Sequence, residues 1–191
     1  MKKALMIACV LFVAVISTAC INNIAVQELN NKAAEYMQKG DYESAMNRLQ
    51  ASLDLDSTMY ETYYNLGIAA INAKKFDKAI EALEGGIKIK PDFADFYYSL
   101  GIAQADLSDE IVEVTEEKKE ISEEDKAKSI EYKKYAIENL TKYLEMKPDT
   151  EDKQTIEELI AESNSIINGD TPNETEYCSH HLHKSHAPYL V

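Results

Sequence analysis

The residues best suited to chemistry lie close together near the C-terminus. Cys178 is followed by every histidine of the sequence, namely His180, His181, His183 and His186. Imidazole nitrogens and a thiolate are ligands that zinc, copper and nickel prefer. Their spacing matches no zinc motif, however, and nothing nearby in the sequence would hold a rigid geometry. We therefore expect residues 169–191 to form a disordered tail with, at most, weak affinity for a divalent metal.

The rest of the chain offers little for catalysis. No histidine or cysteine lies between residues 26 and 168. Asp54 and Asp56 suggest the start of a calcium loop, but Met59 stands where such a loop needs glycine. Gly85 and Gly86 lie within a helical pattern rather than after a strand, so they do not form a phosphate-binding loop. We expect no enzyme activity and no cofactor. The net charge of −14 repels phosphate backbones, so we also expect no nucleic-acid partner.

The N-terminus has the pattern of a targeting segment. Lys2 and Lys3 precede an apolar run over residues 4–16, and the small residues 17–19 come directly before Cys20. The run fits a signal peptide over residues 1–19 and is too short to span a bilayer comfortably. Ordinary signal cleavage and a retained anchor helix are the alternatives.

This segment resembles a bacterial lipoprotein signal, in which the cysteine becomes the lipid-bearing first residue. The resemblance implies lipidation at Cys20, a short tether over residues 20–25 and attachment through more than one acyl chain. It places the protein in the cell envelope, facing the periplasm or the exterior. In lipoproteins of this type the residue after the cysteine bears on which membrane holds the protein. Here that residue is Ile21 rather than aspartate, and this favours the outer membrane if one is present.

A repeated pattern occupies the middle of the chain. Its clearest copy has two apolar runs at helical spacing, followed by a proline: Tyr63, Leu66, Gly67 and Ala70, then Phe76, Ala79, Leu83 and Pro91. The same pattern occurs 34 residues upstream, and Tyr97, Leu100 and Gly101 repeat its first half 34 residues downstream. The second half of that third copy is delayed by 23 residues. The pattern resembles the tetratricopeptide repeat family, whose unit is a helix–turn–helix of 34 residues.

The resemblance implies an all-α stack of three helix–turn–helix units within residues 26–168. The units are expected at residues 26–59, 60–93 and 94–149, and residues 150–168 are expected to form a capping helix. Asp149 and Thr150 can begin that helix, and Asn168 with Gly169 can end it.

The third unit carries an insertion at about residues 107–128. Ser122 with Asp125 has the form of a capping box, which predicts a helix from Glu123 to Met146. We expect the insertion to extend each helix of the unit by about three turns, with a turn near residues 119–122.

Two features of the repeats are left open by the sequence. Ser52 and Gly86 occupy a repeat position that carries a small residue in this family. Tyr143 occupies the same position in the third unit, so the sequence leaves the packing there open. Gly86 has a packing role by this argument, whereas no role is evident for Gly85.

In proteins of this family the first helix of each unit lines a groove that binds a partner. The residues that would face the groove are Tyr64, Asn65, Ile68, Ile71, Tyr98 and Ile102, with Asn30, Ala34, Met37 and Ala105 beside them. The positions that hold a terminal carboxylate in chaperone-binding relatives read Asn30, Ala34, Asn65, Asp95 and Ser99, so only Asn65 agrees. The alternative is that these side chains pack beneath the insertion or the next repeat.

We therefore expect a membrane-anchored scaffold or assembly factor that binds a protein or peptide in the bacterial envelope. The alternatives are a metal-handling envelope protein that uses the Cys/His tail, and a structural spacer that self-associates.

Overall fold

The computed structural model describes residues 23–113 and 120–169, and these ranges contain helices and no strands. Residues 23–38 are helical. The helices that follow are α2 (Tyr42–Leu55), α3 (Tyr60–Asn72), α4 (Phe76–Ile89), α5 (Ala94–Val112), α6 (Glu123–Met146) and α7 (Lys153–Asn168). The predicted all-α fold is confirmed.

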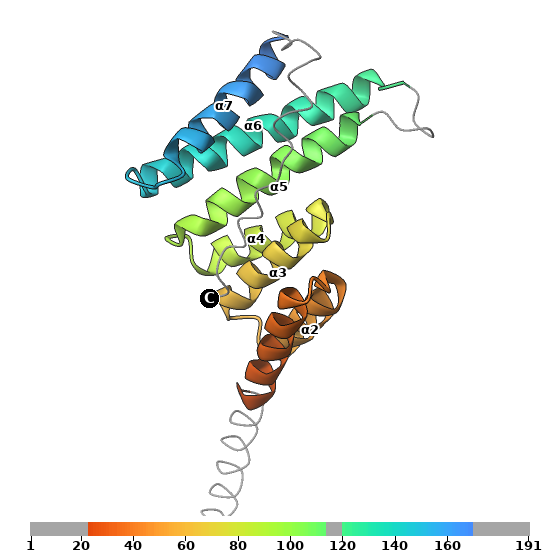
Figure 1. Cartoon of the computed structure of the whole chain (residues 1–191), viewed down its shortest axis with the longest axis vertical. Coiled ribbons are helices and arrows are strands. Elements are labelled where there is room, and N and C mark those ends of the chain that lie inside the picture. The colour runs from red at the N-terminus through yellow and green to blue at the C-terminus, as the bar shows by residue number, and fades with distance from the viewer. Residues whose placement is uncertain (1–22, 114–119, 170–191) are drawn as a thin grey trace, which may run out of the picture.

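The helices form consecutive pairs that stack into an elongated array (Figure 1). Residues 23–38 begin the first pair with α2, α3 packs on α4, and α5 packs on α6. Each pair also packs on the next, through α2 with α3 and through α4 with α5, and α7 covers α6. No helix within the described ranges is long and apolar enough to cross a membrane.

Within the second and third pairs, a glycine lets the two helices approach closely. A Cβ atom added to Gly67 would lie 2.6 Å from the side chain of Leu83. One added to Gly101 would lie 2.7 Å from Cγ of Leu140. Both distances are far shorter than an ordinary contact between carbon atoms. The small residues predicted at these positions therefore set the spacing of the helices.

Contacts between successive pairs differ in chemistry. The amide of Asn30 donates to Ser52 Oγ within the first pair at 3.0 Å, and it accepts from Thr62 Oγ1 of the second pair at 3.2 Å. Between the second and third pairs, Phe96 fills the notch at Gly86 and is fully buried. Gly86 is small because Phe96 of the following pair fits against it, whereas the fully buried Ser52 accepts a hydrogen bond from Asn30.

The structure also explains Gly85. A Cβ atom there would lie 2.8 Å from Cε1 of Tyr63, so this glycine makes room for a ring from α3. The sequence alone offered no role for it. The two adjacent glycines therefore accommodate two different aromatic side chains.

The insertion lengthens both helices of the third pair, but unequally. As predicted, α6 begins after Ser122, whose Oγ accepts a bond of 3.0 Å from the backbone N–H of Asp125. It has 24 residues against 14 in α4, which is close to the three extra turns expected.

The expected three turns are wrong for α5, which has 19 residues against 13 in α3 and ends at Val112. Its last turn has no basic residue, and Asp109 and Glu110 lie there instead. Asp109 is paired with Lys133 of α6, and the negative charge of Glu110 opposes the helix dipole at this end.

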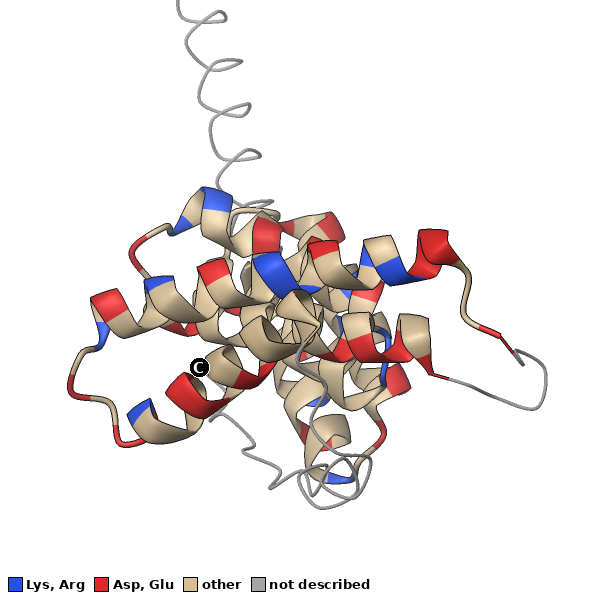
Figure 2. Cartoon of the chain, turned by 90° about the horizontal axis from the view of Figure 1, so that it is seen from above, with Lys and Arg blue, Asp and Glu red and all other residues tan. Residues whose placement is uncertain are grey.

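Polar side chains join the two extended helices. Asn139 donates to Gln104 at 2.9 Å, and Ser108 donates to the backbone carbonyl of Ser129 at 2.9 Å. Lys133, only 4% exposed, donates to a carboxylate oxygen of Asp109 at 2.7 Å. We call the extended parts of α5 and α6 the arm, and these pairs the arm contacts. Figure 2 shows acidic residues gathered on both sides of the grey loop at the end of this hairpin.

The capping helix is present, although its predicted start is wrong. Helix α7 begins at Lys153, with Asp152 at the position before it, whereas the hydroxyl of Thr150 lies 3.2 Å from that of Tyr143. Its predicted end is confirmed, because Gly169 has the left-handed backbone, with φ of 78°, that terminates helices. Ile156 and Ser163 are buried against α6, as a capping role requires.

Candidate functional site

Three tyrosines lie on successive elements of the stack, Tyr64 on α3, Tyr98 on α5 and Tyr143 on α6. The rings of Tyr98 and Tyr143 lie 5.2 Å apart. Tyr64 places its ring against Phe93 and Phe96, at 5.3 and 5.7 Å between ring centres. Tyr143 occupies the repeat position that Ser52 and Gly86 fill in the other pairs. A large side chain at that position is the one sequence signal that could have indicated this cluster.

The surroundings of the tyrosines change their acidity. Burial raises the pKa of Tyr64, a hydrogen bond from Ser99 opposes that shift, and the carboxylate of Asp95 adds to it. Burial likewise raises the pKa of Tyr98, with smaller contributions from Asp152 and Tyr143. Both phenols therefore stay neutral at physiological pH and can donate as well as accept hydrogen bonds.

One lysine, Lys147, lies near Asp95, one of the two acidic side chains beside the tyrosines. Lys147 Nζ lies 3.7 Å from a carboxylate oxygen of Asp95, and both side chains are partly exposed. Asp152 precedes α7 close to Tyr98. We call the set of Tyr64, Tyr98, Tyr143, Asp95, Ser99, Lys147 and Asp152 the tyrosine cluster. Tyr98, Asp95, Asp152 and Lys147 are at least partly accessible, whereas Tyr64, Ser99 and Tyr143 are buried.

The residues predicted to line the groove divide into two groups. Tyr64, Asn65 and Ile68 are only 3%, 7% and 5% exposed, so the prediction of an open strip is wrong for these three. Phe93 and Phe96 of the following pair cover Tyr64, and Ile68 belongs to the same apolar core. The alternative of packing beneath the next repeat is therefore correct for Tyr64 and Ile68.

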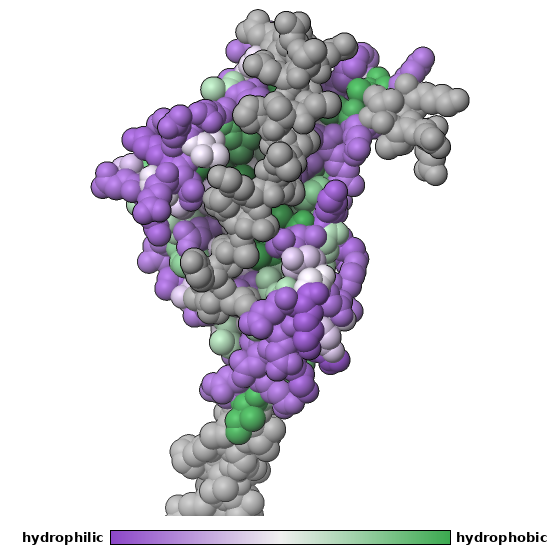
Figure 3. All heavy atoms as spheres, in the orientation of Figure 1, coloured by the Kyte–Doolittle hydropathy of each residue, from purple (hydrophilic) through white to green (hydrophobic). Residues whose placement is uncertain are grey.

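The other predicted groove residues remain partly accessible. Ile71, Tyr98 and Ile102 are half-buried, the first on α3 and the other two on α5. We call the surface formed by residues 23–38, α3 and α5 the first-helix face. Figure 3 shows separate patches of hydrophobic residues bordered by hydrophilic ones. A role for these residues in binding stays a prediction.

The four residues predicted beside them, Asn30, Ala34, Met37 and Ala105, are each partly or wholly buried. Asn30 turns its amide toward Ser52 and Thr62, and Ala105 is buried. Ala34 and Met37 are half-buried. The first-helix face is therefore narrower than the sequence suggested.

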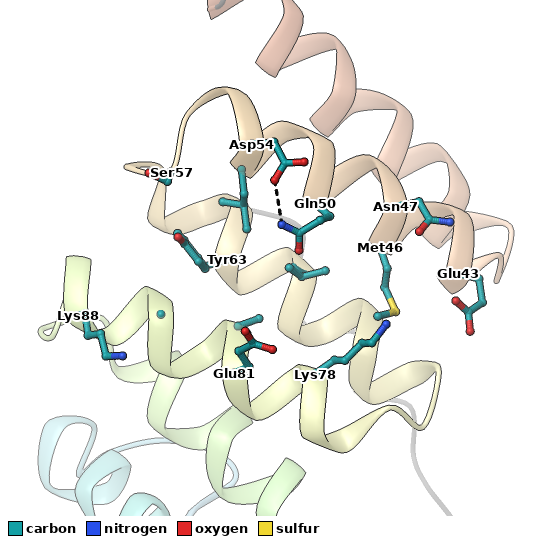
Figure 4. Close-up of a pocket in the computed structure, with 14 residues that line it drawn as sticks. Glu43, Met46, Asn47, Gln50, Asp54, Ser57, Tyr63, Lys78, Glu81 and Lys88 are labelled. Carbon is teal, nitrogen blue, oxygen red and sulfur yellow. Dashed lines mark hydrogen bonds between the residues drawn. The ribbon is translucent and has the colours of Figure 1, made fainter.

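A cleft of about 570 Å³ opens on the second helices of the first two pairs (Figure 4). Its apolar lining comes from Met46 and Leu53 of α2, Leu66 of α3 and Ala82 of α4. Charged and polar side chains surround these, including Glu43, Gln50, Asp54, Lys78, Glu81 and Lys88. The amide of Gln50 donates to Asp54 at 3.2 Å. This cleft was not predicted from the sequence. The available sequence signal was Gly85, a glycine within a helix that had no evident role, and it lines the cleft together with Tyr63.

Two predicted sites lie outside the described residues: Cys20, and the Cys178 and histidine tail. Within residues 23–113 and 120–169, no group of three His, Cys, Asp or Glu side chains could hold a metal ion. The lipidation and metal-binding hypotheses therefore stay predictions.

Antiparallel helix pairs that recur every 34 residues and stack side by side define an α-helical repeat protein. Residues 36–104 match the family model described as tetratricopeptide repeat. The match covers that part of the chain, and the structure continues the same helix arrangement through α7. Comparison with curated proteins finds no match.

Solved structures of tetratricopeptide domains share the fold. The second such domain of human RPAP3, in complex with the HSP70 peptide SGPTIEEVD, superposes with a TM-score of 0.58 at 11% identity, over 75% of this chain and 98% of that one. The Sgt2 domain from Aspergillus fumigatus gives 0.58 at 17% identity, over 77% and 84%. The Yersinia enterocolitica type III secretion chaperone SycD, in complex with a peptide of the translocator YopD, gives 0.53 at 15% identity, over 75% and 92%.

Proposed function

We propose that this protein is a scaffold that binds a protein or peptide segment on its first-helix face, without catalysis, in the bacterial cell envelope. The observation that carries the proposal is the likeness of its helix stack to tetratricopeptide domains whose structures contain bound peptides. At identities of 11 and 15%, that likeness shows the fold alone. The argument for binding therefore also draws on this chain's own residues.

The first-helix face has the composition of a recognition surface. Ile71 on α3 and Tyr98 and Ile102 on α5 are half-buried, so each exposes part of an apolar or aromatic side chain. Such side chains carry much of the energy in protein interfaces when a partner excludes water from them. A helix or an extended segment with bulky side chains would fit this surface.

The acidic residues of the tyrosine cluster make the proposed partner different from the acidic HSP70 peptide. Asp95 lies at a position where chaperone-binding relatives carry a basic side chain, and Lys147 already lies 3.7 Å from its carboxylate. A segment ending in Glu, Glu, Val and Asp would bring further negative charge to Asp95 and Asp152. We therefore expect the partner segment to be neutral or basic where it meets the cluster.

Membrane anchoring is the second part of the proposal. It is supported by Lys2 and Lys3, the apolar run of residues 4–16 and the position of Cys20 directly after small residues. Helical structure is present from residue 23, so a lipid on Cys20 would hold the first pair close to the membrane surface. The partner is then expected to be an envelope protein.

The test is capture of a partner from solubilised envelope with the full chain, followed by affinity measurements. Ile71→Ala combined with Ile102→Ala should weaken binding at least tenfold, because it removes two apolar contacts from the first-helix face. Ile80→Ala combined with Ile87→Ala is the matched control, since these isoleucines of α4 are also half-buried. Both double variants should melt at similar temperatures.

Equal affinity for the two double variants would remove the first-helix face from the proposal. A partner lost only with the α4 pair would instead assign binding to the second helices.

A further inference from the structure

The tyrosine cluster presents an acidic and aromatic surface. Asp95 and Asp152 contribute two carboxylates and Lys147 one ammonium group, with the half-buried ring of Tyr98 beside them. A segment that suits this surface would carry hydrogen-bond donors or a positive charge, together with apolar side chains. Such a segment occurs in the chain itself.

Residues 177–191 have this composition. They contain Lys184 and all four histidines but no Asp or Glu, in a chain with 34 acidic and 20 basic residues. A neutral imidazole still has one N–H to donate to a carboxylate or a phenol oxygen, so the match needs no change of protonation. Apolar side chains are interspersed and end the chain: Leu182, Pro188, Tyr189, Leu190 and Val191.

The chain is long enough to bring this segment to the cluster. Asp152 lies at the start of α7, whose 16 residues span roughly 24 Å at 1.5 Å per residue. The eight residues 169–176 can extend to roughly 26 Å at about 3.3 Å per residue. They can therefore return along α7 and bring residue 177 level with Asp152 and its neighbour Tyr98.

We propose that residues 177–191 dock on the first-helix face at the tyrosine cluster and compete there with the partner. Docking follows from the chemistry of the two surfaces, whereas the competition rests on the proposed function. Because the segment is tethered, its effective concentration at the cluster is about 1 mM. An intrinsic dissociation constant of about 0.1 mM would then leave the segment docked about nine-tenths of the time and weaken partner binding about tenfold.

The docking test uses the full chain in detergent micelles at constant pH with a chelator present. Cys9→Ser and Cys20→Ser leave Cys178 as the single thiol, and a nitroxide label is attached to it. Amide signals of α5 near Asp95 and Tyr98 should broaden, and those of α2 and α4 around the cleft should not. Broadening of both faces alike, or of neither, would overturn the proposal.

Charge variants make the test specific. Asp95→Asn with Asp152→Asn should reduce the broadening severalfold, because the carboxylates that receive the imidazole and ammonium donors are gone. Asp77→Asn with Glu81→Asn, both on α4, is the matched control and should leave it unchanged. If the α4 variants abolish the broadening and the cluster variants do not, the segment docks elsewhere and the assignment is wrong.

Competition is measured separately. Removing residues 170–191 should strengthen binding of the captured partner about tenfold, and the free peptide of residues 177–191 should reverse that gain. Unchanged affinity would overturn the competition while leaving the spectroscopic result to decide docking. Failure to capture any partner would count against the proposed function alone, since the label experiment needs no partner.

Discussion

Gly86→Ala tests whether the aromatic notch fixes the spacing of the second and third pairs. A Cβ atom at this position would lie 2.1 and 2.2 Å from Cζ and Cε1 of Phe96. Phe96 is fully buried, and the rings of Tyr64 and Phe93 lie within 5.7 Å of its own, so it has no room to retreat. Alanine should gain up to about 1 kcal/mol in helix propensity. Overpacking costs about 1–3 kcal/mol, and an approach this close to a confined ring belongs to the upper part of that range, about 2–3 kcal/mol, so we expect a net loss of about 1–2 kcal/mol.

The adjacent position provides the control. A Cβ atom at Gly85 would approach only Tyr63, whose half-buried ring lines the open cleft and can turn into it. Gly85→Ala should therefore be neutral or stabilising by up to about 1 kcal/mol. Urea and thermal unfolding followed by circular dichroism would separate the two variants, with Gly86→Ala melting about 2–8 °C lower than wild type.

A double-mutant cycle identifies the cause. Phe96→Leu shortens the side chain that meets the new methyl group, so Gly86→Ala should cost at least about 1 kcal/mol less in that background. If Gly86→Ala raises the melting temperature as Gly85→Ala does, the notch does not limit the approach of the helices and the reasoning is refuted.

Four further predictions concern the anchor, the arm and the tyrosines. Cys20→Ala should move the protein from the membrane to the soluble fraction, and an unmodified Cys20 amino terminus in mass spectra would contradict lipidation. Lys133→Ala should cost about 3 kcal/mol in urea unfolding, because it breaks a largely buried ion pair, and Lys133→Met should cost less because it keeps the stem's packing. Deleting residues 107–129 should leave a cooperatively melting helical protein; loss of both helicity and cooperativity would show that the arm belongs to the core. Burial raises the pKa of Tyr64 and Tyr98, so stability should be complete below about pH 10 and fall above it, and Tyr64→Phe with Tyr98→Phe should flatten that fall.

Local sequence signals predicted the ends of helices well where a side chain or backbone feature acts by itself. Ser122 marked the start of α6, and the left-handed glycine at residue 169 marked the end of α7. Thr150 misled the prediction for the start of α7, because its hydroxyl is engaged by Tyr143 rather than by the helix. A capping residue is recognisable in sequence only when no tertiary contact competes for it.

The accessibility of the candidate site could not be predicted in the same way. Helical spacing correctly identified Tyr64 and Tyr98 as equivalent positions on successive first helices. It could not show that Phe93 and Phe96 cover Tyr64, whereas Tyr98 remains half-buried beside Tyr143. This difference depends on which residues the next pair brings, and those lie tens of residues away in the chain. Gly85 was unexplained for the same reason, since Tyr63 approaches it from another helix.

The arm contacts have a consequence for how the molecule opens. Gln104, Ser108 and Asp109 are joined to α6 through hydrogen bonds, whereas the repeats contain fully buried leucine and phenylalanine side chains in addition to the hydrogen bonds of Asn30. Water can replace hydrogen-bond partners at a small net cost, but it cannot replace apolar burial. We therefore predict that the arm opens more readily than the repeats, so amide hydrogen exchange should quicken along α5 from Gln104 toward Val112.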